Sequence, residues 1–115
     1  MSADHSEPLS SSVHRWSKAA TEIWRGHSPT FDDYLNDLDL RHRIEVQLRD
    51  ASDAKKLFEH PAVRTELLMA DDQFRAATAE QTECVWGEKN AREENWSSER
   101  EWYYYRLPLR RPAYW

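Results

Sequence analysis

Glycine and cysteine are almost absent from this sequence, and both shortages exclude classes of protein. The 115 residues include two glycines, Gly26 and Gly87, and one cysteine, Cys84. Loops that hold nucleotide phosphates need several closely spaced glycines, so phosphate-binding loops of the Rossmann and Walker types are excluded. A single cysteine cannot form an intramolecular disulfide, which excludes a disulfide-stapled secreted scaffold and favours a reducing compartment.

Long apolar runs are also missing. No run approaches the roughly 18 residues that a membrane-spanning helix requires, and residues 1–8 lack the basic and apolar regions of a signal peptide. We therefore expect a cytoplasmic protein without a membrane partner.

Charge is abundant but unevenly placed. The net charge is −5 at pH 7, whereas residues 102–115 contain three arginines and no acid, so residues 1–101 carry −8. An acidic body joined to a basic segment predicts that this segment lies against its own body or against a second copy. The acidic body disfavours non-specific nucleic-acid binding.

Helical periodicity predicts a mainly α fold, a small domain of four or five helices with an extended aromatic C-terminal segment. We expect a flexible N-terminus over residues 1–9 and a helical domain over residues 10–106. Residues 107–115 are predicted to be extended and packed on the domain or on a partner, because the residue before each proline favours extended backbone.

Polar residues suggest the ends of the first helices. Ser10, Ser11 or Ser12 can cap the first helix, and Gly26 can end it. Ser52 can cap a short helical turn that follows the second helical region.

The second helical region begins at a predicted cap, Thr30, and has two helical interpretations. Residues 31–38 and residues 40–48 present apolar faces that point about 200° apart. Either the helix breaks near residue 38, or it is continuous and buried on several sides. A minority interpretation takes residues 44–48 as a strand.

The most regular apolar stripe starts a helix at Pro61, a residue that suits the first helical position, and reaches Ala77. Thr78 and Gln81 have the spacing of a capping box for a further helix. Residues 88–101 are mostly charged and are expected to form a solvated helix or loop.

The aromatic C-terminal stretch carries the strongest functional signal. Ser98 and Glu101 can cap a helix that reaches Tyr105, while the tyrosine run equally favours a strand. Tryptophan, tyrosine and arginine are enriched at protein interfaces. The candidate binding residues are Trp102, Tyr103, Tyr105, Arg106, Arg110, Arg111, Tyr114 and Trp115. In a competing interpretation this stretch completes the core. Its aromatic rings then cover Trp16, Trp24 and Phe74.

Four aspartates, Asp32, Asp33, Asp37 and Asp39, form the densest acidic patch. Paired carboxylates can perform acid–base chemistry, but acids in the first turn of a helix are also favoured by its exposed amides. A third interpretation makes the patch a contact surface for a basic partner. No catalytic residue, cofactor or metal site is predicted, because the histidines are scattered without ligand spacing.

The leading functional hypothesis is a non-enzymatic protein-binding or regulatory module that uses an aromatic and arginine-rich surface, with a protein partner or self-association. The alternative is a small-molecule binding protein or enzyme whose pocket is lined by Trp16, Tyr34, Trp86 and aromatics of the C-terminal stretch. Single-stranded nucleic-acid binding through the C-terminal segment is the third hypothesis.

Overall fold

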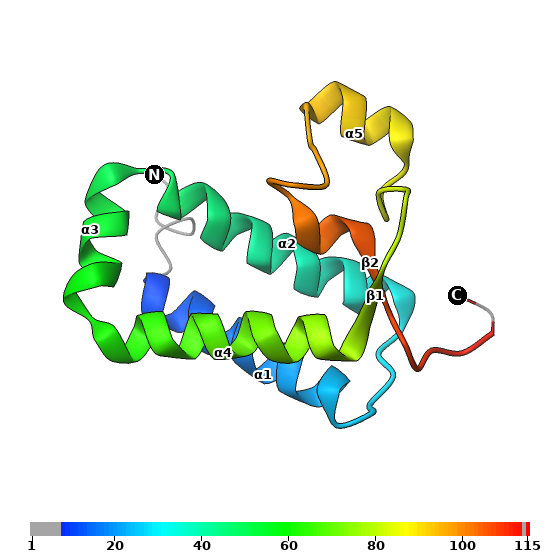
Figure 1. Ribbon diagram of the computed structural model, residues 1–115, viewed down its shortest axis with the longest axis horizontal. Helices are drawn as coiled ribbons and strands as arrows, with labels where there is room; N and C mark the ends of the chain where they lie inside the picture. Colours follow the sequence, from blue (N-terminus) through cyan, green and yellow to red (C-terminus); the bar gives the residue numbers. More distant parts are fainter. Residues whose placement is uncertain (1–7, 114) are drawn as a thin grey trace.

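The computed structural model describes residues 8–113 and 115, without the side chains of residues 51, 53 and 58, and confirms the mainly α fold. Figure 1 shows the elements along the chain. Their order is α1 (Leu9–Trp24), α2 (Phe31–Leu48), α3 (Ala51–Glu59), α4 (Pro61–Ala77), β1 (Thr78–Glu80), α5 (Glu88–Glu94), the 3-10 helix η2 (Trp102–Tyr105) and β2 (Arg106–Pro108).

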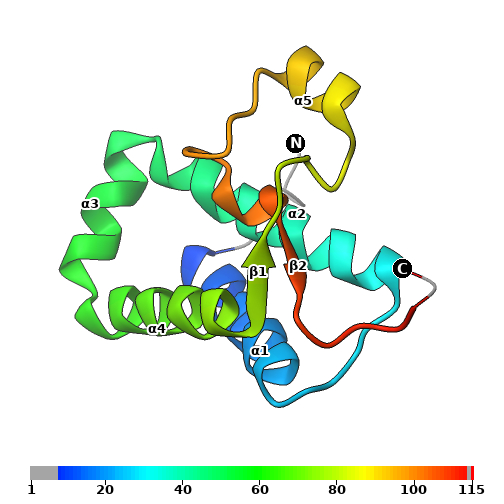
Figure 2. The same ribbon diagram turned by 45° about the vertical axis from the view of Figure 1, so that its right-hand side comes forward.

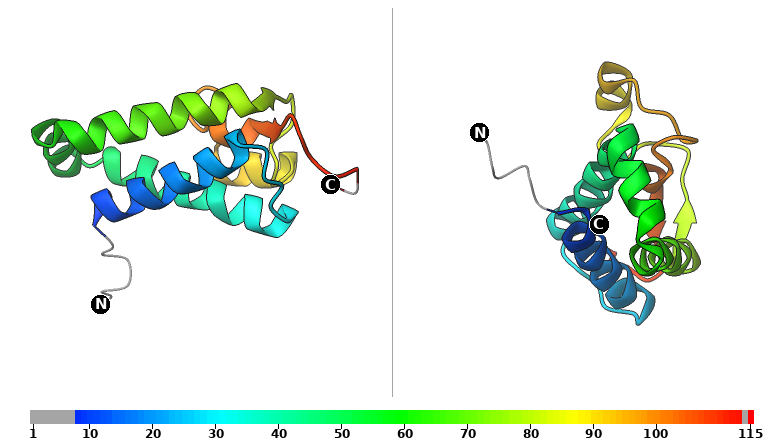
Figure 3. Two further views of the ribbon diagram at one scale, coloured as in Figure 1. Left: turned by 90° about the horizontal axis from the view of Figure 1, so that it is seen from below. Right: turned by 90° about the vertical axis from the view of Figure 1, so that its left-hand side faces the viewer.

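Three helices form the body of the domain. Helix α1 packs along α4 and against α2, and α3 joins α2 to α4. Figure 3 shows α3 at the opposite end of the molecule from the C-terminal segment. Helix α5 stands away from the body on the α2 side (Figures 1 and 2). No helix in the described ranges is long and apolar enough to cross a membrane.

Helix α2 is continuous, which confirms the interpretation of a single helix and excludes the two alternatives, a break near residue 38 and a strand over residues 44–48. The Thr30 hydroxyl accepts a hydrogen bond from the Asp33 amide at 3.1 Å, which confirms the predicted cap. Both apolar faces are covered, since Leu38 and Ile44 are fully buried. Helix α1 packs on one side of α2 and η2 contacts another, and this enclosure is why the apolar pattern runs round the helix.

Aromatic rings from four elements meet in the core. Phe74 of α4 lies 5.0 Å from Trp16 of α1, 6.3 Å from Tyr34 of α2 and 6.0 Å from Trp102 of η2, measured between ring centroids. The aromatic stretch thus contributes to the core as well as to the surface. Its contribution to the core agrees with the competing interpretation of its composition. Trp24 is exposed instead of lying under that stretch.

A buried ion pair joins α2 to α4. Asp71 accepts hydrogen bonds from Nε and Nη2 of Arg41, each at 3.0 Å, and from Nε1 of Trp16 at 2.9 Å. Arg41 also donates to Glu45 at 3.1 Å, and its guanidinium carbon lies 5.3 Å from the centroid of the Tyr103 ring. One polar cluster therefore holds α1, α2, α4 and η2 together.

The end of α4 corrects one prediction. Pro61 begins α4 as predicted, but Thr78 starts a strand and not a new helix. The Thr78 hydroxyl donates to the Phe74 carbonyl at 2.8 Å, and the chain then enters the antiparallel sheet that Figure 2 shows beside α4. The register pairs Thr78 with Pro108, Ala79 with Leu107 and Glu80 with Arg106. Because the partner strand lies far along the sequence, local spacing could not reveal it.

The predicted serine caps are wrong. Helix α1 already begins at Leu9, which places residues 10–12 in its first turn. At α3 the cap is Asp50, whose carboxylate accepts a hydrogen bond from the Ser52 amide at 2.9 Å. Gly26 ends α1 as predicted, with a φ of 95° that a side chain would strain.

Glu101 has a different role from the predicted capping box with Ser98. Its fully buried carboxylate accepts hydrogen bonds from the Ser97 amide at 2.7 Å and from Arg49 at 2.6 Å. The chain then forms the short η2 instead of a longer helix. In the segment 107–115, residues 107 and 108 belong to strand β2, residues 109 and 110 form a bend, residues 111 and 112 have no regular secondary structure, and residue 113 lies in a turn.

Candidate functional site: a cleft between α2 and α5

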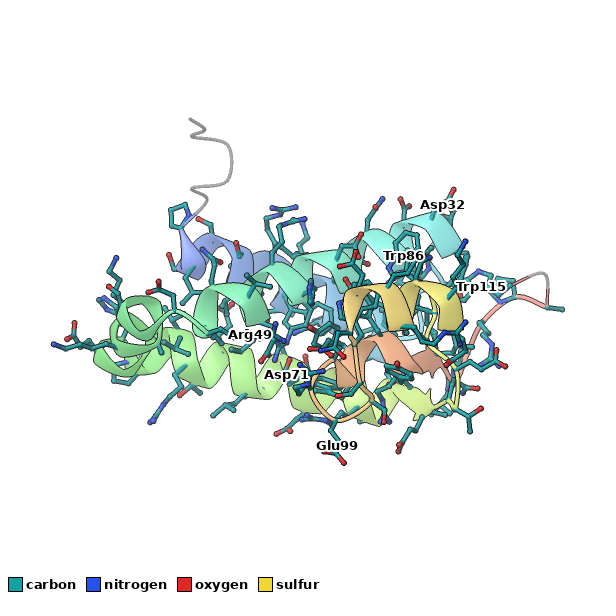
Figure 4. All side chains as sticks on the ribbon, turned by 90° about the horizontal axis from the view of Figure 1, so that it is seen from above. Asp32, Arg49, Asp71, Trp86, Glu99 and Trp115 are labelled. Carbon is teal, nitrogen blue, oxygen red and sulfur yellow. The ribbon has the colours of Figure 1, made fainter. Side chains whose placement is uncertain are left out.

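A cleft of about 420 Å³ opens between α2 and α5. Figure 4 shows Trp86 between the ribbons of these two helices. The residues that line the cleft are Asp39, His42, Arg43, Trp86, Asn90, Glu94, Trp96 and Tyr104. Its volume lies within the range of about 300–1,000 Å³ that is usual for ligand sites.

Asp39 lies where the two sides of the cleft meet. Its Oδ1 atom accepts a hydrogen bond from the Tyr104 hydroxyl at 2.7 Å and another from Nε1 of Trp86 at 3.2 Å. Its Oδ2 atom accepts no hydrogen bond from any residue that the structure describes. Oδ1 therefore holds the Tyr104 and Trp86 side chains in place, and Oδ2 remains able to accept a hydrogen bond.

Aromatic packing fixes the far side of the cleft. The Trp96 ring stacks on Tyr104 with centroids 4.5 Å apart and planes 29° apart, and His42 meets Trp96 edge to face at 5.5 Å. The Trp96 amide donates to the Ala91 carbonyl at 2.8 Å, which ties this ring to α5. Asn95 adopts the left-handed conformation with φ 58° and turns the chain back towards α2.

His42 and the two buried tyrosines are electrically neutral components of the site. Burial, and then the positive charge of Arg49, lower the pKa of His42, so the imidazole is uncharged at neutral pH. Its Nδ1 is hydrogen-bonded to the Tyr103 hydroxyl at 2.7 Å. Burial raises the pKa of Tyr103 and Tyr104, so both hydroxyls stay protonated. The formal charges that line the cleft are those of Asp39, Glu94 and Arg43.

Four of the predicted binding residues are buried or half-buried. Tyr103 and Tyr105 are 0% and 7% exposed. Trp102 is half-buried, and the Arg75 guanidinium carbon lies 3.8 Å from its ring centroid. Arg106 donates to the Thr78 hydroxyl at 2.7 Å and to its carbonyl at 3.0 Å. These side chains hold the domain together and are not offered to a partner in this conformation.

The remaining predicted residues lie at the end of the chain. Arg110 and Arg111 are exposed; Arg111 donates to the Pro108 carbonyl at 2.6 Å, and Arg110 lies against Gly26. Trp115 packs against α2 and does not project outward. Tyr114 lies outside the described residues.

The four aspartates do not act as one patch. Asp32 and Asp33 are exposed in the first turn of α2, and Figure 4 shows Asp32 pointing outward. Asp39 belongs to the cleft. Asp37 is half-buried near α1, where burial, and then the carboxylates of Asp33 and Glu22, raise its pKa to about 6.

Sequence reasoning identified only part of the cleft. The predicted aromatic pocket included Trp86, which lines the cleft, but also Trp16 and Tyr34, which are fully buried in the core. Trp96 and His42 were missed as site residues. The available signal for Trp96 was a lone tryptophan in a charged segment, whereas nothing local distinguishes His42 from the other histidines.

No family model, curated protein or solved structure matches this chain. Within the described ranges no group of three or more histidine, cysteine, aspartate or glutamate side chains is arranged to hold a metal ion.

Proposed function

We propose that this protein is a non-enzymatic binding module that holds a basic side chain of a partner protein in the α2–α5 cleft. The observation that carries the proposal is Asp39, whose Oδ1 is fixed by two hydrogen bonds while its Oδ2 has no partner among the described residues. A carboxylate oriented in this way is a suitable acceptor for an ammonium or guanidinium group.

The rest of the cleft supports a cationic ligand. Trp86 and Trp96 line it and are both half-buried, and a cation against the face of either ring gains about 0.5–2 kcal/mol. Arg43 also lines the cleft, but with the carboxylates of Asp39 and Glu94 the formal charge of the lining is −1, which disfavours an anion. At an effective dielectric constant of 20, a unit charge about 4 Å from a carboxylate gains about 4 kcal/mol before desolvation is counted.

The hydrogen-bonding groups favour holding a ligand over transforming one. The Tyr104 hydroxyl donates to Asp39, and the Tyr103 hydroxyl is hydrogen-bonded to His42. Each is therefore already engaged within the protein. This arrangement keeps Asp39 and the aromatic rings in a defined geometry, which lowers the ordering cost of binding.

Protein NMR tests the proposal with single-residue probes. N-acetyl-lysine amide, N-acetyl-trimethyllysine amide and N-acetyl-arginine amide are titrated into the full chain, with N-acetyl-norleucine amide as the neutral control. Since the probes make few contacts, we expect dissociation constants on the order of 1 mM, which correspond to about 4 kcal/mol. The indole N–H signals of Trp86 and Trp96 should shift with a cationic probe and stay unchanged with norleucine.

Two variants distinguish binding in the cleft from a general effect of surface charge. Asp39→Asn keeps an oxygen acceptor for Tyr104 and Trp86 but removes the charge, so we expect at least tenfold weaker binding of the cationic probes. Asp32→Asn removes an exposed charge from the same helix and should leave binding unchanged. Equal shifts with norleucine, or equal effects of the two substitutions, would contradict a cation site at Asp39. Ranking the three cationic probes distinguishes an ammonium from a guanidinium ligand.

A further inference from the structure

His42 offers a second polar atom to the α2–α5 cleft. It lies three residues after Asp39 on α2, and both side chains line the cleft. Side chains with this spacing are neighbours on one face of a helix, with Cβ atoms about 5–6 Å apart. The Nε2 atom of His42 is not buried and has no hydrogen-bond partner among the described residues. Its hydrogen-bonding capacity is therefore left for a molecule in the cleft.

The Tyr103 hydroxyl decides which nitrogen of His42 carries the proton. Tyr103 is 0% exposed, and its hydroxyl has one hydrogen-bond partner among the described residues, Nδ1 of His42 at 2.7 Å. A buried hydroxyl that did not donate would be an unsatisfied donor, which is rare in folded proteins. The hydroxyl therefore donates to Nδ1. Since burial, and then Arg49, lower the pKa of His42, the ring is uncharged at neutral pH and its one N–H lies at Nε2.

This donor complements the carboxylate of Asp39. Oδ2 of Asp39 can accept from a cation, whereas Nε2 of His42 can donate to an acceptor about one helical turn away. We propose that the cleft recognises an ammonium group together with a carbonyl oxygen of the same partner, and that His42 donates to this carbonyl from Nε2. In a partner protein the carbonyl belongs to the main chain beside the basic side chain. This inference rests on the cation site at Asp39 and adds to it a requirement for an uncharged acceptor.

Two matched probes test the requirement for a carbonyl. Both are trimethylammonium ions on a propyl chain; in the ketone probe the chain ends in a methyl ketone, and in the alkene probe a methylene group replaces the ketone oxygen. The quaternary nitrogen cannot condense with the ketone. In NMR titrations of the full chain at pH 7.5, the ketone probe should bind about threefold to tenfold more tightly, the gain expected from one net hydrogen bond.

The imidazole nitrogens of His42 provide a readout on the unaltered protein. In long-range proton–nitrogen correlation spectra of the free protein, Nδ1 should resonate as an unprotonated nitrogen and Nε2 as a protonated one. The ketone probe should then shift the Nε2 signal further than the alkene probe does. A proton on Nδ1 in place of Nε2, or equal shifts with the two probes, would overturn the proposal.

The variant His42→Asn distinguishes His42 from other donors that line the cleft, such as Arg43. The asparagine carbonyl can accept from the Tyr103 hydroxyl in place of Nδ1, but its side chain is too short to donate from the position of Nε2. We therefore expect the two probes to bind this variant equally. His27→Asn, at an exposed histidine outside the cleft, should keep the preference for the ketone. A preference that persists in His42→Asn would assign the donor to another residue and contradict the role of His42.

Failure of this inference and failure of the cation site give different results. If the wild-type protein binds both probes with equal affinity, the cation site stands and the role of His42 is overturned. If it binds neither probe, the cation site itself fails, and this inference fails with it.

Discussion

Replacing Asp71 with alanine should remove a large part of the protein's stability. The side chains of Arg41 and Asp71 are 5% and 9% exposed, and they share two hydrogen bonds of 3.0 Å. Removing one partner of a buried pair typically costs about 3–5 kcal/mol, and the Trp16 N–H loses its acceptor as well, at about 1–3 kcal/mol. Glu45 still accepts from Arg41 at 3.1 Å, which limits the loss. We expect about 4 kcal/mol, from a total of about 5–15 kcal/mol.

The assay is urea unfolding followed by far-ultraviolet circular dichroism, with thermal unfolding as a second measure. A loss of 4 kcal/mol in a domain of this size lowers Tm by roughly 16 °C. Asp72→Ala is the matched control, because the neighbouring side chain is 82% exposed and its ion pair to Arg75 spans 3.9 Å; it should change stability by less than about 0.5 kcal/mol. The double variant Arg41→Met with Asp71→Leu should recover part of the loss, since it leaves no buried charge unpaired, although the Trp16 N–H still lacks its acceptor. An Asp71→Ala loss below about 1 kcal/mol would refute the assignment of this pair as the main polar link in the core.

Three further substitutions test local features. Asp37→Asn should raise the free energy of unfolding at pH 7.5 by about 1 kcal/mol, a value reduced for partial solvent exposure, because the folded-state pKa of about 6 exceeds the ordinary 3.8 and the charged form is disfavoured. The gain should nearly vanish at pH 4, where folded wild-type protein is already protonated at this site; a gain that is equal at both pH values would exclude this cause. Thr30→Ala should cost about 1 kcal/mol in urea unfolding through loss of the α2 cap, and no loss would mean that the Asp33 amide is satisfied otherwise. Gly26→Ala should cost about 1 kcal/mol or more, measured in the same way, since its φ of 95° is unfavourable for a side chain.

Local signals predicted the helices well where the stabilising interaction is itself local. The Thr30 cap, the Gly26 terminus and Pro61 at the start of α4 each depend on a few adjacent backbone groups, so the sequence alone was sufficient. The apolar circumference of residues 31–48 also predicted a central helix correctly. It left a break as an open alternative, because the elements that cover α2 come from distant parts of the chain.

Features that depend on distant partners were predicted poorly. Thr78 has the composition of a helix cap, but its strand pairing comes from Pro108, on the far side of α5 in the sequence. Glu101 has the spacing of a capping box with Ser98, but its carboxylate accepts a hydrogen bond from the guanidinium of Arg49, the residue that follows α2. In both cases a long-range contact overrode a plausible local motif.

The candidate site also combines features that local sequence predicts with features that depend on distant partners. Composition marked the C-terminal aromatics as significant, but it could not separate Tyr103, whose hydroxyl is hydrogen-bonded to His42, from Tyr104, whose hydroxyl donates to Asp39. Only the fold of the whole chain brings Trp86 and Trp96, which lie on either side of α5 in the sequence, to one cleft beside α2. The acidic patch was predicted as a unit because its members are close in sequence, whereas the helix directs Asp39 to the cleft and leaves Asp32 in solvent.

The most direct test of a cation site in the α2–α5 cleft is an intermolecular nuclear Overhauser measurement between N-acetyl-trimethyllysine amide and the full chain. We predict cross-peaks from the N-methyl protons to indole protons of both Trp86 and Trp96, and their loss in Asp39→Asn. Cross-peaks confined to the exposed Trp24, or peaks that persist unchanged in Asp39→Asn, would contradict the proposed site.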